Sequence, residues 1–159
     1  MDMLHRFGVR EPSKSFCCRM NPSSETISHI FCTSEVARQV WGCFEVLIGE
    51  FHGALTVRHK VMSWWVRPTQ TSYLGFVLHM LPLLICWNLW KMRNVWMFEG
   101  RLDSVMHVCD KIFLELREVF CLQFREVPQV CSARTDFFDM IGRSRDRVTI
   151  LKVCWKCST

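Results

Sequence analysis

Residues 74–100, LGFVLHMLPLLICWNLWKMRNVWMFEG, are the most apolar stretch of the chain and decide its fold. A membrane-spanning helix needs roughly 20 consecutive apolar residues. Residues 74–90 are shorter than that, contain His79, Pro82 and Asn88, and have basic residues beyond both ends. We therefore predict a buried helix with a kink at Pro82 and no membrane span. A membrane-associated protein that uses residues 74–90 is the least favoured alternative.

The same helix continues with a heptad-like stripe and ends at Gly100, because glycine is well suited to the residue just past a helix. Asp103 is a suitable cap for the next helix. The stripe consists of Leu83, Trp87, Trp90, Asn94 and Met97.

The following helix has apolar side chains at the same spacing until Pro128 is approached. These positions are Val105, Cys109, Ile112, Leu116 and Val119. Two adjacent stripes predict a long antiparallel helical hairpin. We expect Trp87, Trp90 and Trp96 to lie in its core, whereas Glu115 and Glu118 indicate a solvated face.

Three helices are predicted before this hairpin. A short one starts after Ser24 and has Ile27, Ile30 and Phe31 at helical spacing. Ser34 can cap the next, which repeats apolar residues every three or four positions and has Gly49 just past its end. The third covers Leu55 to Val66 and stops at Pro68. The predicted fold is therefore mainly α: a short irregular Cys/His segment followed by a small helical bundle with the hairpin. We divide the chain into a front segment 1–50, a helical connector 51–127 and a linker-like tail 128–159, with a short helix around residues 136–141 and a strand at 148–153.

The composition favours an intracellular protein in the cytoplasm or nucleus. Half of the 159 residues are apolar, and the start of the chain carries charges where a secretory signal would be apolar. In a reducing compartment most of the ten cysteines act as small apolar side chains. The net charge of +5 tolerates an anionic partner, but the basic residues are scattered. We interpret the C-x-x-C spacing of Cys154 and Cys157 as fortuitous, because the thioredoxin-like context of a redox pair is missing.

A group of thiols and one imidazole near the front has the ligand types that structural zinc prefers. These candidate ligands are Cys17, Cys18, His29 and Cys32. Their spacing departs from a standard knuckle, in which a C-x2-C turn faces a second pair on a helix. The competing interpretation is that the cysteines are buried and that His29 is hydrogen-bonded.

Several motifs resemble the zinc-binding domain that follows the polymerase in plant non-LTR, LINE-type retrotransposon reverse transcriptases. They are LHRFG at 4–8, CC at 17–18, ETISHIF at 25–31 and ARQVW at 37–41. Downstream, ICWNLWKMRN at 85–94 and FEG at 98–100 are similar to the connector helix that precedes the RNase H domain in that family. The resemblance implies a zinc finger-like segment and nucleic-acid binding.

Two departures from the family pattern remove expected zinc ligands. The family's first and fourth cysteines correspond to Ser15 and Ser34, and serine is not among the usual ligands of zinc. We therefore expect no cofactor, unless zinc occupies a shifted site at Cys17, Cys18, His29 and Cys32. The polymerase's paired aspartates are also missing, so we predict no catalytic residues and no enzymatic activity.

These observations lead to two main hypotheses. The first is a noncatalytic fragment of a retroelement reverse transcriptase, with a degenerate zinc-binding domain and weak binding to RNA or DNA. Trp64, Trp65 and Arg67 are its predicted nucleic-acid contacts, because exposed aromatic rings stack on bases. The second is a metal-free helical protein-interaction module that self-associates through exposed apolar helix surface.

Overall fold

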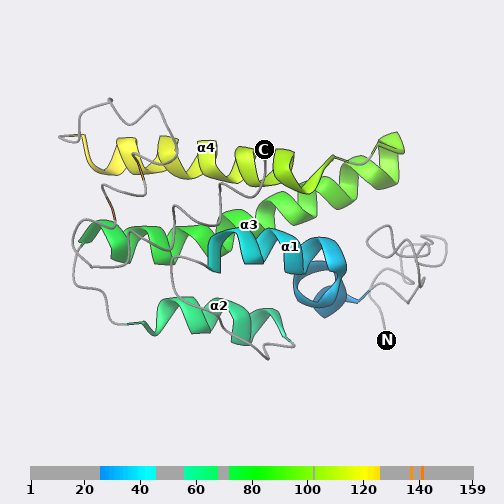
Figure 1. Cartoon of the computed structure of the whole chain (residues 1–159), viewed down its shortest axis with the longest axis horizontal. Coiled ribbons are helices and arrows are strands. Elements are labelled where there is room, and N and C mark those ends of the chain that lie inside the picture. The colour runs from blue at the N-terminus through cyan, green and yellow to red at the C-terminus, as the bar shows by residue number, and fades with distance from the viewer. Residues whose placement is uncertain are drawn as a thin grey trace, which may run out of the picture.

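The computed structural model describes residues 26–45, 56–67, 72–101 and 103–125, together with Phe137 and Ile141 (Figure 1). Over these residues the chain is helical and has no strand, which confirms the predicted mainly α fold. The elements are the π-helix η2 (His29–Thr33), α1 (Glu35–Glu45), α2 (Val57–Trp65), α3 (Ser72–Glu99) and α4 (Val105–Gln123). Residues 148–153, where a strand was predicted, lie outside the described residues.

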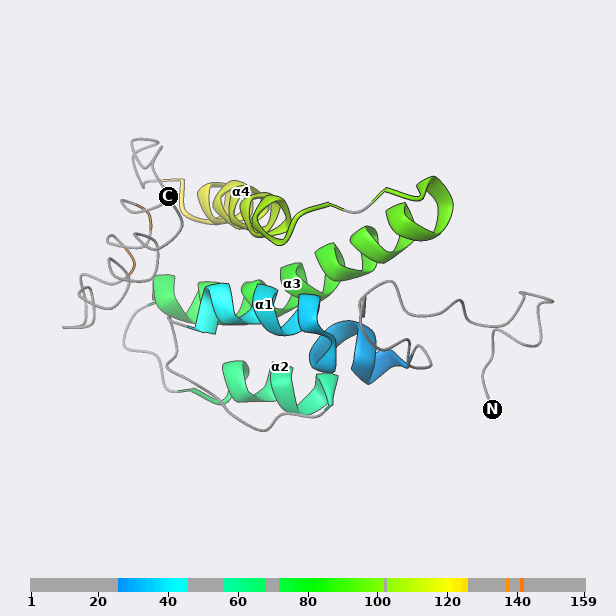
Figure 2. The same ribbon diagram turned by 45° about the vertical axis from the view of Figure 1, so that its right-hand side comes forward.

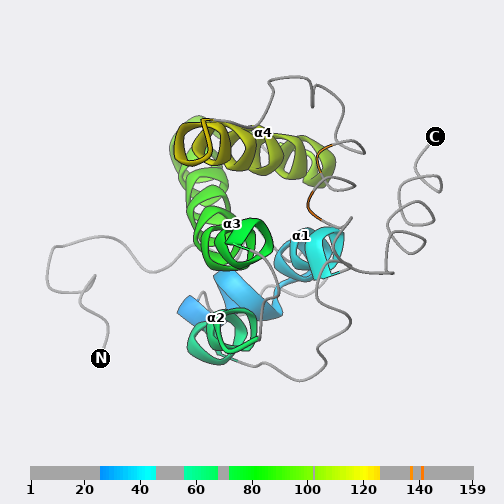
Figure 3. The same cartoon turned by 90° about the vertical axis from the view of Figure 1, so that its left-hand side faces the viewer.

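Helix α3 is the longest element, and the other helices are arranged around it (Figures 2 and 3). It continues through Pro82, and α4 then runs back along it in the opposite direction, as predicted for the hairpin. The chain leaves α3 at Gly100, whose φ of 65° is a conformation that glycine adopts without strain. Helices α1 and α2 and the π-helix also contact α3.

Hydroxyl side chains cap three of the helices. The Oγ atom of Ser34 accepts a hydrogen bond of 3.1 Å from the Ala37 N–H, as predicted for α1. Thr56 caps α2 and Ser104 caps α4 in the same way. The prediction that Asp103 caps α4 is wrong, because its carboxylate instead binds the Lys111 ammonium at 2.9 Å.

The segment before α1 is a single π-turn. Its wider hydrogen-bonding pattern is visible in the 2.9 Å bond from the Ser34 N–H to the carbonyl of His29, five residues earlier. The turn is held to α1 by Trp41, whose Nε1 donates to the Phe31 carbonyl at 2.7 Å. This arrangement places His29 and Cys32 beside the bundle.

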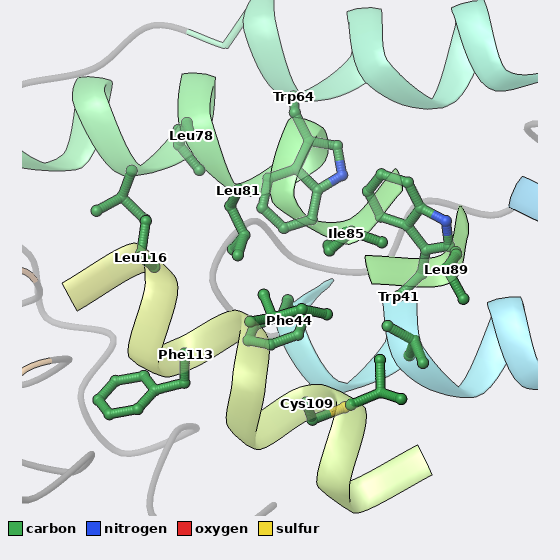
Figure 4. Close-up of a cluster of buried hydrophobic side chains, with 14 of the residues drawn as sticks. Trp41, Phe44, Trp64, Leu78, Leu81, Ile85, Leu89, Cys109, Phe113 and Leu116 are labelled. Atoms are coloured by element: carbon green, nitrogen blue, oxygen red, sulfur yellow. The ribbon is translucent and has the colours of Figure 1, made fainter. Parts of the chain in front are cut away.

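One apolar core joins residues on both sides of the predicted domain boundary at residue 50 (Figure 4). Trp41 and Phe44 of α1 pack with Trp64 of α2 and Ile85 of α3, and all four are at most 1% exposed. Burying each such side chain contributes roughly 1.5–3 kcal/mol. The described helices therefore fold around a common core.

Two residues of the predicted tail also belong to this core. Phe137 and Ile141 are 1% and 2% exposed. The Phe137 ring meets Phe113 and Phe120 of α4 edge-on, with centroids 5.5 and 5.1 Å apart. Both positions have helical backbone, and the rest of the predicted short helix around residues 136–141 lies outside the described residues.

Helices α3 and α4 meet through a different face of α3 from the one predicted. The buried side chains of α3 are Val77, Leu78, Leu81, Pro82, Ile85, Asn88, Leu89 and Met92. On α4, Cys109, Ile112 and Leu116 are buried, as the sequence predicts. The predicted heptad stripe of α3 is therefore exposed and does not form the contact with α4.

Candidate functional site

The outward face of α3 carries a row of large apolar side chains that the described helices leave partly exposed. Leu83, Trp87, Trp90 and Met97 are between 39% and 50% exposed, and the neighbouring Phe98 is 85% exposed. Asn94 lies in the same row and is partly buried. We call these six residues the outer stripe. Single exposed apolar residues are common in proteins, but a contiguous row of them is typical of an interaction surface.

A stacked pair of tryptophans forms the centre of the outer stripe. The rings of Trp87 and Trp90 lie 5.0 Å apart with an angle of 19° between their planes. The Lys91 ammonium is 5.5 Å from the centroid of the Trp87 ring. Stacking and the cation–π contact together hold two large flat surfaces in a fixed orientation.

The polar residues next to the two tryptophans, Asn88 and Lys91, attach this part of α3 to α4. The Asn88 amide is 3% exposed and donates to the Glu115 carboxylate at 2.8 Å and to the Leu84 carbonyl at 2.9 Å. The other Glu115 oxygen accepts from Lys91. Glu115 therefore joins the two helices, which corrects the expectation that it lies on a solvated face.

At the N-terminal end of the outer stripe, α2 contributes another exposed ring. Trp65 is 37% exposed and stacks on the ring of His79, with centroids 6.2 Å apart and planes 13° from parallel. Its Nε1 donates to the His79 carbonyl at 3.1 Å. Because His79 lies one helical turn before Leu83, Trp65 extends the apolar surface.

The predicted nucleic-acid contacts do not form one exposed group. Trp64 is fully buried in the core, 5.9 Å from the Trp41 ring, so the prediction that it is exposed is wrong. Trp65 points outward, and Arg67 is half-buried. The two adjacent tryptophans lie on different sides of α2, because neighbouring helical residues are about 100° apart.

Two of the four predicted zinc ligands lie outside the described residues, namely Cys17 and Cys18. Cys32 is 6% exposed, and burial raises the pKa of its thiol while Lys60 opposes this shift. His29 is half-exposed, with its Nδ1 3.4 Å from the Thr33 Oγ1. Within the described ranges, no three His, Cys, Asp or Glu side chains are grouped to hold a metal ion. The shifted zinc site stays a prediction.

A charged pair lies near the thiols of Cys32 in η2 and Cys86 in α3. Lys60 of α2 forms an ion pair with Glu45 of α1, and its ammonium is 5.4 Å from the centroid of the Trp41 ring. Burial raises the pKa of Cys86 to about 12, and the neighbouring Cys32 adds to this shift. Thiols with raised pKa values are poor nucleophiles near neutral pH. We therefore assign this cluster to the stability of the fold.

Sequence reasoning missed the exposure of Trp87 and Trp90, which were expected in the core. The signal that identifies the buried face is polar: Asn88 and Lys91 both turn toward Glu115 of α4. Asn88 is the buried one of the two, and around the helix Trp87 lies about 100° and Trp90 about 160° from it, so both tryptophans lie away from the side that Asn88 buries. A partly buried network of this kind is difficult to recognise before the partner helix is known.

Helix α3 is also long and apolar enough to cross a membrane. Residues Tyr73–Glu99 have a mean hydropathy of 1.5 in their most apolar window, of which 39% is buried within the bundle. The core helix of a folded bundle has the same character. Length and composition therefore do not distinguish the two.

Comparisons with known proteins leave this surface as the main guide to function. No family model matches the sequence, and neither a curated protein nor a solved structure is similar to it.

Proposed function

We propose that this chain is a noncatalytic helical module that binds a helix of another polypeptide through the outer stripe. The observation that carries this proposal is the exposed, stacked pair of Trp87 and Trp90 within a row at heptad spacing. Tryptophan is strongly enriched among the residues that dominate the energy of protein interfaces. The alternative of a metal-free interaction module is therefore the better supported of the two hypotheses.

The spacing of the outer stripe favours a helical ligand. Positions 83, 87, 90, 94 and 97 alternate between steps of four and three residues, which is the pattern of a helix–helix seam. From Leu83 to Met97 the stripe extends about 20 Å at 1.5 Å per residue. An amphipathic helix of a few turns would cover this length with its own apolar face.

The surface is also rigid before it meets a ligand. Glu115 fixes Asn88 and Lys91 beneath the tryptophans, and the core side chains hold the opposite face of α3. A rigid surface loses little conformational entropy on binding, so more of the gain from apolar burial appears as affinity.

A titration with a synthetic amphipathic peptide, with leucine at its heptad core positions, tests the proposal. We expect its binding to shift the tryptophan emission and to be weakened roughly tenfold or more by Trp87→Glu. Leu122→Glu on α4 is the matched control, because Leu122 is 72% exposed and is not part of the outer stripe. Equal affinity for the parent and the Trp87→Glu variant would refute the proposal.

Nucleic-acid binding is a second candidate, supported by the same tryptophan pair and by the resemblance of residues 85–94 to the reverse transcriptase connector. Exposed rings stack on unpaired bases, and the net charge of +5 favours an anionic ligand. Against this, Lys91 is neutralised by Glu115. Binding of poly(U) RNA that Trp87→Ala removes, and that weakens steeply with salt, would support this candidate.

The origin as a reverse transcriptase fragment with a degenerate zinc-binding domain also remains a proposal. Its support is the order of the sequence motifs and the π-turn that carries His29 and Cys32. Metal analysis of the reduced protein tests the zinc site. We expect less than stoichiometric zinc, whereas one tightly held ion that is lost in His29→Ala would establish the shifted site.

A further inference from the structure

We infer that the helix bound by the outer stripe is the same α3 of a second copy of this chain, in a parallel, in-register pair. This inference rests on the proposed function and names its partner. Three observations carry it: the register of Asn94, the charges beside the stripe, and the exposed area.

Asn94 has a defined position in the heptad pattern. Counting from Leu83 as a d residue, Trp87 and Asn94 occupy a positions, and Trp90 and Met97 occupy d positions. A single asparagine at an a position selects a two-stranded parallel pair, because each carboxamide then has an identical partner across the seam. Among the described residues the Asn94 side chain has no hydrogen bond, so its amide is available for that pairing.

The charges beside the stripe are compatible with a second copy. Lys91 occupies an e position and Arg93 a g position, and the stripe has no acidic residue. In a parallel pair, each g residue faces the e residue of the next heptad on the other helix. Lys91 then faces Cys86, and Arg93 faces Phe98. Identical copies therefore meet without bringing two cations together.

The area of the stripe is sufficient for a small, specific dimer. Its five apolar side chains are 39% to 85% exposed, and a large aromatic side chain has roughly 150–250 Å² to bury. Together they offer roughly 500 Å² per copy, or about 1,000 Å² in the pair, which reaches the lower limit of specific interfaces. A symmetric pair also closes on itself, since the same patch is used twice.

Sedimentation of the whole chain over a range of concentrations tests the inference. We expect a monomer–dimer equilibrium that Trp87→Glu and Trp90→Glu each shift toward monomer by roughly tenfold or more in Kd. Leu122→Glu should leave the equilibrium unchanged, and circular dichroism should show that all variants remain folded. Dimers that survive Trp87→Glu and Trp90→Glu, or that Leu122→Glu disrupts, would overturn the inference.

The register is tested by Asn94→Leu, which removes the polar residue from the seam. We expect tighter association together with species larger than a dimer, because buried asparagine limits both stability and oligomer size. An unchanged equilibrium in Asn94→Leu would overturn the parallel register.

The peptide titration separates this inference from the proposed function. A monomer that binds the heptad peptide refutes the second copy and leaves the interaction surface intact. A monomer that binds no peptide refutes both. If such a monomer enters phosphatidylcholine vesicles through Trp87 and Trp90, a membrane ligand replaces the proposed helix.

Discussion

Lys60 of α2 and Glu45 of α1 form an ion pair almost closed off from solvent, with side-chain exposures of 11% and 19%. The Lys60 ammonium also lies over the Trp41 ring. The pair therefore joins α2 to α1, and its ammonium also opposes the raised pKa of the Cys32 thiol in η2.

Removing the cation of this pair should destabilise the fold strongly. In Lys60→Met the Glu45 carboxylate loses its counter-ion while most of its surroundings stay apolar. We expect the free energy of unfolding to fall by about 3 kcal/mol, as is typical when one partner of a buried pair is removed. Urea denaturation followed by circular dichroism measures this change.

The double variant Lys60→Met/Glu45→Met provides the control. Replacing both charges by apolar side chains of similar length removes the unpaired carboxylate, so we expect most of the lost stability to return. A Lys60→Met variant within about 0.5 kcal/mol of the parent would show that the pair is solvated.

Local signals in the sequence were sufficient to predict most helices, because caps and apolar spacing act over a few residues. Ser34 caps α1, and Gly100 ends α3, as predicted. The choice between Asp103 and Ser104 as the cap of α4 could not be made locally. Asp103 does not cap α4 because its carboxylate binds the ammonium of Lys111, which lies about two helical turns further along the chain.

The candidate site could not be derived from periodicity, because α3 is apolar on more than one face. A pattern of apolar residues predicts a buried face only when the opposite face is polar. Here Leu81 and Ile85 are buried, while Leu83 and Trp87 are exposed on the same helix. The residue that distinguishes the faces is Asn88, and its role depends on Glu115 of another helix.

Glu115→Ala should loosen the contact between α3 and α4 behind the tryptophan pair. The variant leaves the Lys91 ammonium without its ion pair and removes one of the two acceptors of the buried Asn88 amide. We expect a loss of about 1–2 kcal/mol in the free energy of unfolding. Glu118→Ala is the control, because Glu118 is exposed on the same helix. Equal stability of the two variants would contradict a structural role for Glu115.

Asp103 should make the stability of α4 depend on pH in acid. The hydrogen bond from Lys111 holds the pKa of Asp103 below its ordinary value of 3.8. A carboxyl whose pKa is lowered by folding stabilises the protein above its unfolded pKa, and this contribution is lost as the pH falls through the folded pKa.

Asp103→Asn should therefore be less stable than the parent near pH 7, and the difference should vanish well below pH 4. Because Lys111 is 44% exposed, we expect a difference of at most about 1 kcal/mol. Urea denaturation at both pH values measures it. Glu99→Gln is the control, since the Glu99–Arg101 pair is more than half exposed. A difference that persists in acid would assign the effect to something other than ionisation.

The Cys86 thiol should resist alkylation in the folded protein far more than in the unfolded chain. Burial, with a smaller contribution from Cys32, raises its pKa from 9.0 to about 12. Because only the thiolate attacks, roughly one Cys86 in three thousand is reactive at pH 8.5. We expect iodoacetamide to modify it at least roughly a hundredfold more slowly than in urea, as measured by peptide mass spectrometry. Equal alkylation rates in the folded and unfolded protein would mean that Cys86 is open to water. In that case η2, which Trp41 holds to α1, would pack against α3 more loosely than the structure shows.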